Sequence, residues 1–399
     1  MQTLEDYKIS PVTGCLLRQP PTPPSSLLPY KKLLERSYSL LKTGELRAAV
    51  QELPTLDTSQ FKTHEEKRLG HKILALLSAQ YVWQDGDRNP AEILPAVIAM
   101  PLMQLSIELG CQPLLGHIDL VLSNCYPEKT QLGQRQSFFT EAFPSNEMNW
   151  VPFIERTADI ELMFSDAAKI IMHIISSIRR NNVPMIVQCL DELGDVISIM
   201  REMLLLLLKE LDPKAFYCDM RPFLSGWSHG QVSKGLVYEG VPDSVLTGAE
   251  EGCLEGNTLP KKRVYLGASA GQSIILQAFD ALLGITHYDD TDKFFTTARN
   301  YMIKEHRRFI EDLQRHVKLR EFVVSSDSCE LKKAYNTCVE ELLQFRREHI
   351  KIVEKFIIEP SCKYSANVES LKSVGTGGTE LIQFLDRVNA KTEEALLPT

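Results

Sequence analysis

Apolar side chains recur at helical spacing throughout residues 331–360 (LKKAYNTCVEELLQFRREHIKIVEKFIIEP). Steps of four, three, four, four and three positions place six side chains on one stripe of a helix with 3.6 residues per turn. The stripe consists of Cys338, Leu342, Phe345, His349, Val353 and Phe356. Charged residues occupy most of the remaining surface. The segment therefore predicts one long amphipathic helix whose apolar face packs on a core.

His349 belongs to this apolar stripe and is therefore predicted to point toward the core. A histidine in such a position is more often a hydrogen-bonded core residue than a metal ligand. The helix alone leaves both interpretations open, and features elsewhere in the chain must decide between them.

Length and charge narrow the possible classes of protein. The chain has 399 residues, 44% of them hydrophobic, and a formal net charge of −8. This length provides for a large core, in one large domain or two unequal ones. An acidic chain does not suit general nucleic-acid binding, which depends on clustered Lys and Arg at phosphates. The one compact basic run, residues 261–263, is interpreted as a solvated loop.

Cysteine spacing and hydropathy predict a cytoplasmic protein. Nine cysteines occur without a CxxC pair, which argues against a zinc knuckle or a redox pair and fits reduced thiols. Residues 1–10 lack the basic and apolar regions of a secretory signal. The most apolar run, residues 203–208, is far shorter than the roughly 20 residues that cross a bilayer. We therefore expect a soluble protein without membrane contact.

Helical patterns dominate the chain, and strand patterns are almost absent, which predicts a mainly α fold. Residues 193–208 are apolar on most sides, as in a helix at the centre of a bundle. Residues 228–264, rich in Gly, Ser and acidic residues, are predicted to form a long loop. The expected organisation is a small N-terminal helical domain with a proline-rich lead-in (residues 1–112) and a large all-α domain (residues 113–399).

Two runs of small residues and one arginine can each be interpreted either as part of a functional site or as purely structural. The small-residue runs GASAGQS (267–273) and GTGGT (375–379) suit either a helix cap and a surface turn, or a ligand contact and a lid. Arg221, close to Phe216 and Tyr217, either holds a carboxylate beside an aromatic ring or extends to solvent at a helix end. A helical bundle with one inward histidine is typical of haem proteins. The alternative is a helical scaffold that binds protein partners and no cofactor.

A series of sequence blocks, in one order along nearly the whole chain, identifies a family. The blocks are LEDYKISPVTGCL (4–16), YVWQDGDRNPAEILP (81–95), HIDLVLSN (117–124), RPFLSGW (221–227), GLVYEGV (235–241), GASAGQSIILQAFDALLGI (267–285), REHIKIVEKFII (347–358) and GTGGTELIQFL (375–385). Together they resemble the indoleamine 2,3-dioxygenases. Several such blocks in one order are highly specific, so the resemblance favours the ligand interpretation of His349.

The resemblance implies haem b bound between a small N-terminal domain and a larger all-α domain. The REHIKIV block implies that His349 is the proximal iron ligand. Phe345 and Val353, a turn to either side, are then expected to form walls against the porphyrin. The haem-side loop implied by the GASA run comprises Ala268, Ser269 and Ala270.

The same resemblance implies a set of substrate residues. Arg221 matches the arginine that clamps the substrate carboxylate, and Thr376 is expected to reach the substrate's ammonium or carboxylate as its loop closes. Thr157 stands where vertebrate members usually have Ser. The aromatic residues that pack on the indole ring or lie on the distal side correspond to Phe216, Tyr217 and Phe153.

Three positions depart from the family pattern. Ala268 replaces a common glycine, Thr157 adds a methyl group to the usual hydroxyl, and His117 stands where vertebrate members commonly have Tyr. None of these changes removes the iron ligand or the carboxylate clamp. Residues 153–157 (FIERT) contain no histidine, whereas the related tryptophan 2,3-dioxygenases carry a distal one. This difference favours the indoleamine 2,3-dioxygenases over the tryptophan 2,3-dioxygenases.

The resemblance implies a haem-dependent dioxygenase acting on L-tryptophan and O2. The expected reaction cleaves the indole C2–C3 bond to give N-formylkynurenine, the first step of the kynurenine pathway toward NAD. Two alternatives share the fold: an O2-storing haem protein like the molluscan myoglobins, and a member of low activity with a signalling role. The expected partners are the two small substrates, without nucleic acid or membrane, and the expected state is a monomer.

Overall fold

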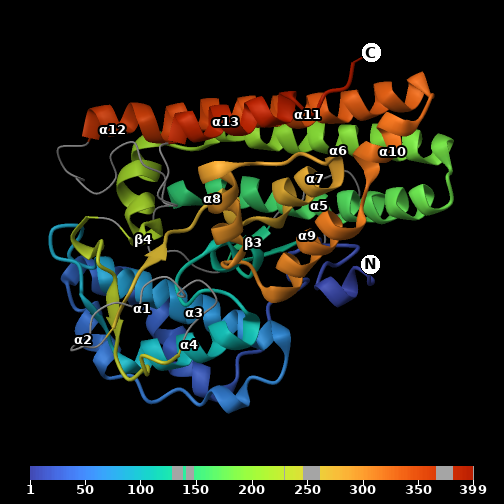
Figure 1. Ribbon diagram of the computed structural model, residues 1–399. Coiled ribbons are helices and arrows are strands. Elements are labelled where there is room, and N and C mark those ends of the chain that lie inside the picture. Colours follow the sequence, from blue (N-terminus) through green and yellow to red (C-terminus); the bar gives the residue numbers. More distant parts are fainter. Residues whose placement is uncertain (128–137, 141–147, 229, 246–260, 365–380, 399) are drawn as a thin grey trace.

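The computed structural model describes residues 1–127, 138–140, 148–228, 230–245, 261–364 and 381–398, and helices dominate it (Figure 1). The helices are α1 (Leu28–Thr43), α2 (Leu46–Gln51), α3 (His64–Trp83), α4 (Ala96–Leu109), α5 (Val151–Arg179), α6 (Val183–Glu210), α7 (Ile274–Leu283), α8 (Asp289–Arg299), α9 (Lys304–His316), α10 (Leu319–Ser325), α11 (Cys329–Val353), α12 (Glu359–Tyr364) and α13 (Leu381–Glu393). The predicted mainly α fold is confirmed.

Short strands connect the helices. They are β1 (Ile93–Leu94), β2 (Cys125–Pro127), β3 (Phe138–Thr140), β4 (Gly226–Trp227), β5 (Leu236–Tyr238), β6 (Lys262–Arg263) and β7 (Tyr265–Leu266). β5 pairs parallel with β1 and antiparallel with β6, while β4 pairs with β7 and β2 with β3. The described part of the region predicted as a loop, residues 228–264, therefore contains strands β5 and β6, which are too short to produce a periodic pattern.

Three long helices form the upper part of the molecule in Figure 1, with α6 packed between α5 and α11. α6 begins with Pro184 in its first turn, and the side chain of Asn182 accepts a hydrogen bond from the amide of Met185. The prediction that this helix is surrounded on most sides is only partly correct. Ile199 is 39% exposed, because α5 and α11 cover only part of the helix circumference.

The predicted helix over residues 331–360 is confirmed, with one change of geometry. α11 begins after Ser328, whose side chain accepts a hydrogen bond from the amide of Leu331. A π-helical turn, Glu354–Ile358, continues α11 directly into α12. The apolar stripe from Cys338 to Phe356 faces the interior, with α6 against one side of the helix and α13 against another.

Helices α1 to α4 gather at the opposite end of the molecule (Figure 1). α3 is buried over most of its length and packs against α1 and α4. Its start is defined by a capping box, in which Thr63 and Glu66 exchange hydrogen bonds between side chain and backbone. This small helical group is compatible with the predicted N-terminal domain.

The predicted boundary between residues 112 and 113 stays a prediction, and several contacts cross it. The Tyr7 hydroxyl donates a hydrogen bond to Asp312 in α9, with an oxygen–oxygen distance of 2.6 Å. Strand β5, from the second half of the chain, pairs with β1 from the first half. The first residues of the chain therefore pack on the large helical part.

Arg263 corrects the interpretation of residues 261–263 as a solvated loop. Its side chain is only 2% exposed and donates hydrogen bonds to the backbone oxygens of Pro242 and Val245. Strand β6 places alternate side chains on opposite faces, so Arg263 turns inward while Lys262 remains exposed.

Two further predictions concern the thiols and the membrane. Every cysteine in the described part of the chain is free, in agreement with reduced thiols. Within the same residues, none of the helices combines the length and hydropathy that spanning a bilayer requires.

Candidate active-site pocket

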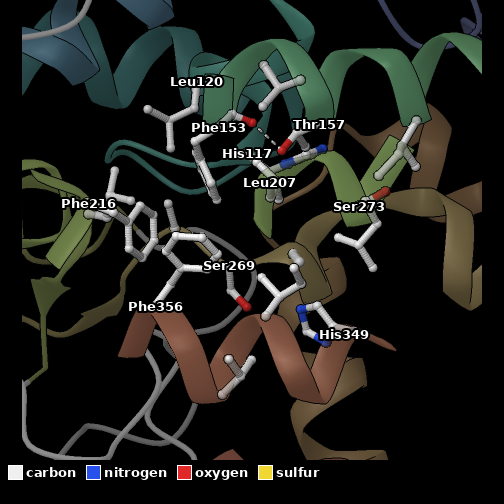
Figure 2. A pocket seen from close by; sticks show the side chains of 18 of the residues that line it. His117, Leu120, Phe153, Thr157, Leu207, Phe216, Ser269, Ser273, His349 and Phe356 are labelled. Carbon is white, nitrogen blue, oxygen red and sulfur yellow. Dashed lines mark hydrogen bonds between the residues drawn. The ribbon is translucent and has the colours of Figure 1, made fainter. Parts of the chain in front are cut away.

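A cavity of about 240 Å³ lies among α5, α6, α11, the segment from Gly267 to Ser273 and the π-helical turn Ile118–Leu122 (Figure 2). Most of its walls are apolar. The sequence-predicted residues that line it are Phe153, Thr157, Phe216, Arg221, Ala268, Ser269, Ala270, Phe345, His349 and Val353. Tertiary packing thus brings together residues from distant parts of the chain at one site.

His349 projects from α11 toward the cavity (Figure 2). Neither of its ring nitrogens has a hydrogen-bond partner among the described residues, which does not fit the interpretation as a bonded core histidine. Burial lowers the pKa of His349 to about 4, with a smaller contribution from the charge of Arg346. The imidazole is therefore neutral at pH 7 and available as a metal ligand.

Two neighbours on α11 flank this histidine. Phe345 and Val353 are four positions to either side of His349, so the helical repeat brings them to the same face. Both line the cavity, and no charged side chain stands between them and His349 on this stripe. A neutral, unbonded imidazole between apolar walls is the environment that a planar, largely apolar haem requires.

The loop from Gly267 to Ser273 supplies a close wall made of small residues. A Cβ atom on Gly267 would lie 2.1 Å from the carbonyl oxygen of Leu224, so only glycine fits against the β4–β7 pair. The Ser269 side chain accepts a hydrogen bond from the amide of Gly271, and Ser273 caps α7. The helix-cap and ligand-wall interpretations are therefore compatible: the loop caps α7 and lines the cavity with Ala268, Ser269 and Ala270.

Aromatic rings form one end of the cavity (Figure 2). The ring centroids of Phe153 and Phe216 are 5.0 Å apart, and those of Phe216 and Phe356 are 6.1 Å apart. These spacings are typical of packed aromatic pairs. The three rings provide a flat, apolar surface of the kind against which another planar ring can pack.

Arg221 also lines the cavity, although its side chain is only 1% exposed. Its guanidinium carbon lies 5.3 Å from the ring centroid of Tyr217. Burial lowers the pKa of Arg221 to about 10, so the group remains protonated at pH 7. A buried position does not fit the interpretation of a side chain that extends to solvent. A charged guanidinium in a mostly apolar cavity is instead suited to binding a carboxylate.

Comparison with known proteins agrees with this geometry. The sequence model of the family "Indoleamine 2,3-dioxygenase" matches residues 3–395. The chain belongs to the indoleamine 2,3-dioxygenase family. It is 33% identical to human indoleamine 2,3-dioxygenase 2, over 99% of this chain and 96% of that protein. Identity to mouse indoleamine 2,3-dioxygenase 1 is also 33%, over 99% of this chain and 96% of the other.

Membership in the indoleamine 2,3-dioxygenase family confirms the predicted oxidoreductase class and the resemblance on which it depended. The family is haem-dependent, which the neutral His349 between apolar walls suits. Relatives also include the myoglobin of the abalone Haliotis diversicolor, 31% identical over 98% of each chain.

Two predicted substrate residues, Tyr217 and Thr376, are not among the residues that line the cavity in the described part of the chain. Tyr217 is fully buried behind the cavity wall and contacts Arg221, whereas its neighbour Phe216 lines the cavity. The two residues are consecutive in the π-helical turn Ala215–Met220, so their side chains leave the backbone in different directions. Thr376 lies outside the described residues, and its role stays a prediction.

Thr157 lines the cavity one helical turn after Phe153. Its hydroxyl donates a hydrogen bond to the backbone oxygen of Phe153, at an oxygen–oxygen distance of 2.7 Å (Figure 2). The hydroxyl proton is therefore engaged within α5.

A cluster of polar residues in the cavity wall was not identified as a site from the sequence. Glu161 accepts hydrogen bonds at the same carboxylate oxygen from His117 Nε2 (2.7 Å) and from the Ser273 hydroxyl (2.6 Å). Phe153, Thr157 and Glu161 are spaced by four residues and so share one face of α5. Extending the helical spacing from the first two residues would have indicated Glu161, whereas nothing local connects it to Ser273.

Proposed function

We propose that this protein is a haem-dependent dioxygenase that cleaves the indole C2–C3 bond of L-tryptophan with O2 to give N-formylkynurenine. The observation that carries the proposal is that His349 and Arg221 line the same cavity. A metal-ligand histidine alone would serve any haem protein. A buried guanidinium in the same mostly apolar space adds a specific site for an anionic organic substrate.

In this proposal His349 holds the iron of haem b, and Phe345, Val353 and the loop Ala268–Ala270 contact the porphyrin. When bound, the haem supplies the iron chemistry by which O2 reacts with the indole ring. The small side chains of the loop support this assignment, since they leave room for a wide planar group beside α11.

The chain's own residues would position the substrate. Arg221 would bind the tryptophan carboxylate through two parallel hydrogen bonds, while Phe153 and Phe216 pack on the indole. The apolar walls would exclude water from the reacting ring and strengthen the attraction between guanidinium and carboxylate. Tyr217 would act indirectly, by supporting Arg221 from behind.

The test is a turnover assay on the haem-loaded, reduced protein with L-tryptophan and O2. Formation of N-formylkynurenine, followed by its ultraviolet absorbance, supports the proposal. Binding of O2 without consumption of tryptophan contradicts it.

That second outcome corresponds to a specific alternative, an O2-binding protein without dioxygenase activity. The likeness to Haliotis diversicolor myoglobin, over 98% of each chain, favours this alternative. Arg221 favours the enzyme, since storage of O2 does not need a carboxylate site.

We further propose that the reaction is the first step of the kynurenine pathway toward NAD, carried out by a cytoplasmic monomer. Free cysteines throughout the described residues are compatible with a reducing compartment. Size-exclusion chromatography with light scattering tests the monomeric state directly.

A further inference from the structure

The cavity contains a polar cluster that the proposed chemistry does not yet use: His117, Glu161 and Ser273. His117 and Ser273 lie away from the aromatic end formed by Phe216 and Phe356 (Figure 2). Glu161 connects the two residues, although they come from segments far apart in the sequence. All three side chains line the cavity, and Glu161 is almost completely buried.

Hydrogen bonds determine which nitrogen of His117 carries a proton. An ionised carboxylate can only accept hydrogen bonds, so both Nε2 of His117 and the hydroxyl of Ser273 must donate to Glu161. In a neutral imidazole, a proton on Nε2 leaves Nδ1 as a bare acceptor. Nδ1 has no hydrogen-bond partner among the described residues.

The position of the His117 ring is also restrained through its backbone. The amide of His117 donates a hydrogen bond to the side-chain oxygen of Gln272, at 3.1 Å. The Gln272 amide group in turn donates to the backbone oxygen of Gly267, at 2.9 Å. His117 is therefore attached to the loop that borders the cavity at its backbone and to α5 at its ring. Such support on two sides is what a positioning residue needs.

The two hydroxyl groups in this part of the wall are engaged. The Thr157 hydroxyl donates to Phe153, and the Ser273 hydroxyl donates to Glu161. Arg221 can only donate hydrogen bonds, and His349 is assigned to the iron under the proposed function. Glu161 Oε2 also has no hydrogen-bond partner, but this oxygen is fully buried, so among the described lining residues His117 Nδ1 is the acceptor that an N–H group of a ligand can reach.

We propose that His117 positions the substrate by accepting a hydrogen bond from the indole N–H at Nδ1, in a tautomer imposed by Glu161 and Ser273. The inference rests on the proposed function, because it assumes an indole in this cavity. Arg221 then holds the carboxylate and His117 the ring nitrogen, so the two groups together determine how the ring lies. The recognised chemical class is a planar heteroaromatic ring with an N–H donor.

The test compares two ligands that differ at one atom: L-tryptophan and its benzothiophene analogue, in which sulfur replaces the indole N–H. Dissociation constants are measured on the ferric, haem-loaded protein from the shift of the haem absorbance, without turnover. The wild-type protein is expected to prefer tryptophan by roughly five- to tenfold, the ratio that corresponds to one ordinary hydrogen bond. A wild-type ratio near one would overturn the inference.

Three variants locate the acceptor. His117→Phe is expected to bring the ratio close to one by weakening tryptophan binding, with the affinity for the sulfur analogue unchanged. His173→Phe, the matched control, changes an exposed histidine of α5 outside the cavity and should keep the wild-type ratio. His117→Asn, whose side-chain oxygen can stand close to the position of Nδ1, should retain part of the preference.

His117→Leu, a smaller apolar replacement, takes the place of His117→Phe if that variant does not fold or hold haem. An unchanged ratio in the apolar variant, or an equal loss of the ratio in His173→Phe, would overturn the inference. The turnover assay distinguishes this result from failure of the proposed function. If only the role of His117 is wrong, the wild-type protein still converts tryptophan to N-formylkynurenine. If the proposed function is wrong, no product forms.

Discussion

Two side chains with different chemical roles face one cavity. The surroundings of His349 keep its imidazole neutral, while Arg221 retains its proton although it is buried. A neutral imidazole can bind a metal ion, and a buried guanidinium attracts an anion. The combination suits the proposed binding of both haem and an amino acid, and each side chain can be tested separately.

Arg221→Ala is expected to lower kcat/KM for L-tryptophan by roughly 10- to 100-fold, since a hydrogen bond to a charged group contributes about 1.5–3 kcal/mol. Haem content, measured from the Soret band, should not change. Arg221→Lys should recover only part of the activity, because an ammonium cannot bind a carboxylate through two parallel hydrogen bonds. Tryptamine, which lacks the carboxylate, provides the control. An equal loss for tryptamine and tryptophan would contradict a carboxylate clamp.

His349→Ala is expected to abolish haem binding, because the imidazole is the proposed iron ligand. The measurement is the ratio of Soret to protein absorbance after reconstitution with haem. His316→Ala, at an exposed histidine in α9, is the matched control and should bind haem normally. A purified His349→Ala protein with a full Soret band would show that the iron ligand is another residue.

Among the helical elements, π-helical turns occur where the chain borders the cavity. The turns Ile118–Leu122, Ala215–Met220 and Glu354–Ile358 each contribute lining residues. A π turn accommodates one extra residue and so changes which side chains point in a given direction. In the last turn, the consecutive residues Phe356 and Ile357 both line the cavity.

Gly267→Ala is expected to destabilise the loop that borders the cavity. Its new methyl group would lie 2.1 Å from the oxygen of Leu224, and relief of this contact must shift the β4–β7 pair. We expect a loss of about 1–3 kcal/mol in the free energy of unfolding, measured with urea, together with weaker haem binding.

Gly194→Ala in α6 is the matched control for this substitution. A Cβ atom there has its nearest neighbour, the Cα of Cys338, at 3.9 Å, which is an ordinary contact. Because alanine favours a helix interior over glycine, this variant should gain about 0.5–1 kcal/mol. Equal effects of the two substitutions would mean that the tight contact at Gly267 does not matter for stability.

For the whole molecule, the first residues of the chain are part of the large helical region. Tyr7 packs its ring on Phe309 in α9, with ring centroids 5.1 Å apart, and bonds to Asp312. In the same region His306 is buried, and its Nε2 has no hydrogen-bond partner. Burial, together with the nearby charge of Arg68, lowers the pKa of His306 to about 3.

Stability is therefore expected to fall in acid because of His306. The unfolded chain takes up this proton near pH 6.5 and the folded protein only near pH 3, so stability decreases as the pH falls between these values. At pH 5 the contribution is about 2 kcal/mol, measurable as a lower urea midpoint than at pH 7. His306→Gln should lose correspondingly less stability over this interval. An unchanged pH dependence in His306→Gln, with the exposed His316→Gln as control, would contradict this account.

The amino-acid sequence by itself determined the elements whose signals are local. Helical periodicity gave the long helices α5, α6 and α11 and the inward direction of His349, because side chains three and four positions apart must share a face. Most of the site residues that the family resemblance indicated line the cavity, whereas the ring of Tyr217 lies behind the wall and Thr376 is outside the described residues.

Only the tertiary structure decided which distant side chains meet. His117 and Glu161 are 44 positions apart, and Glu161 and Ser273 are 112 positions apart, yet both pairs are hydrogen-bonded. Arg263 is buried by strand pairing that leaves no periodic signal in so short a segment. Such contacts depend on how complete helices and strands pack together, and that packing is set by the shapes of all the contacting surfaces rather than by the spacing of residues along the chain.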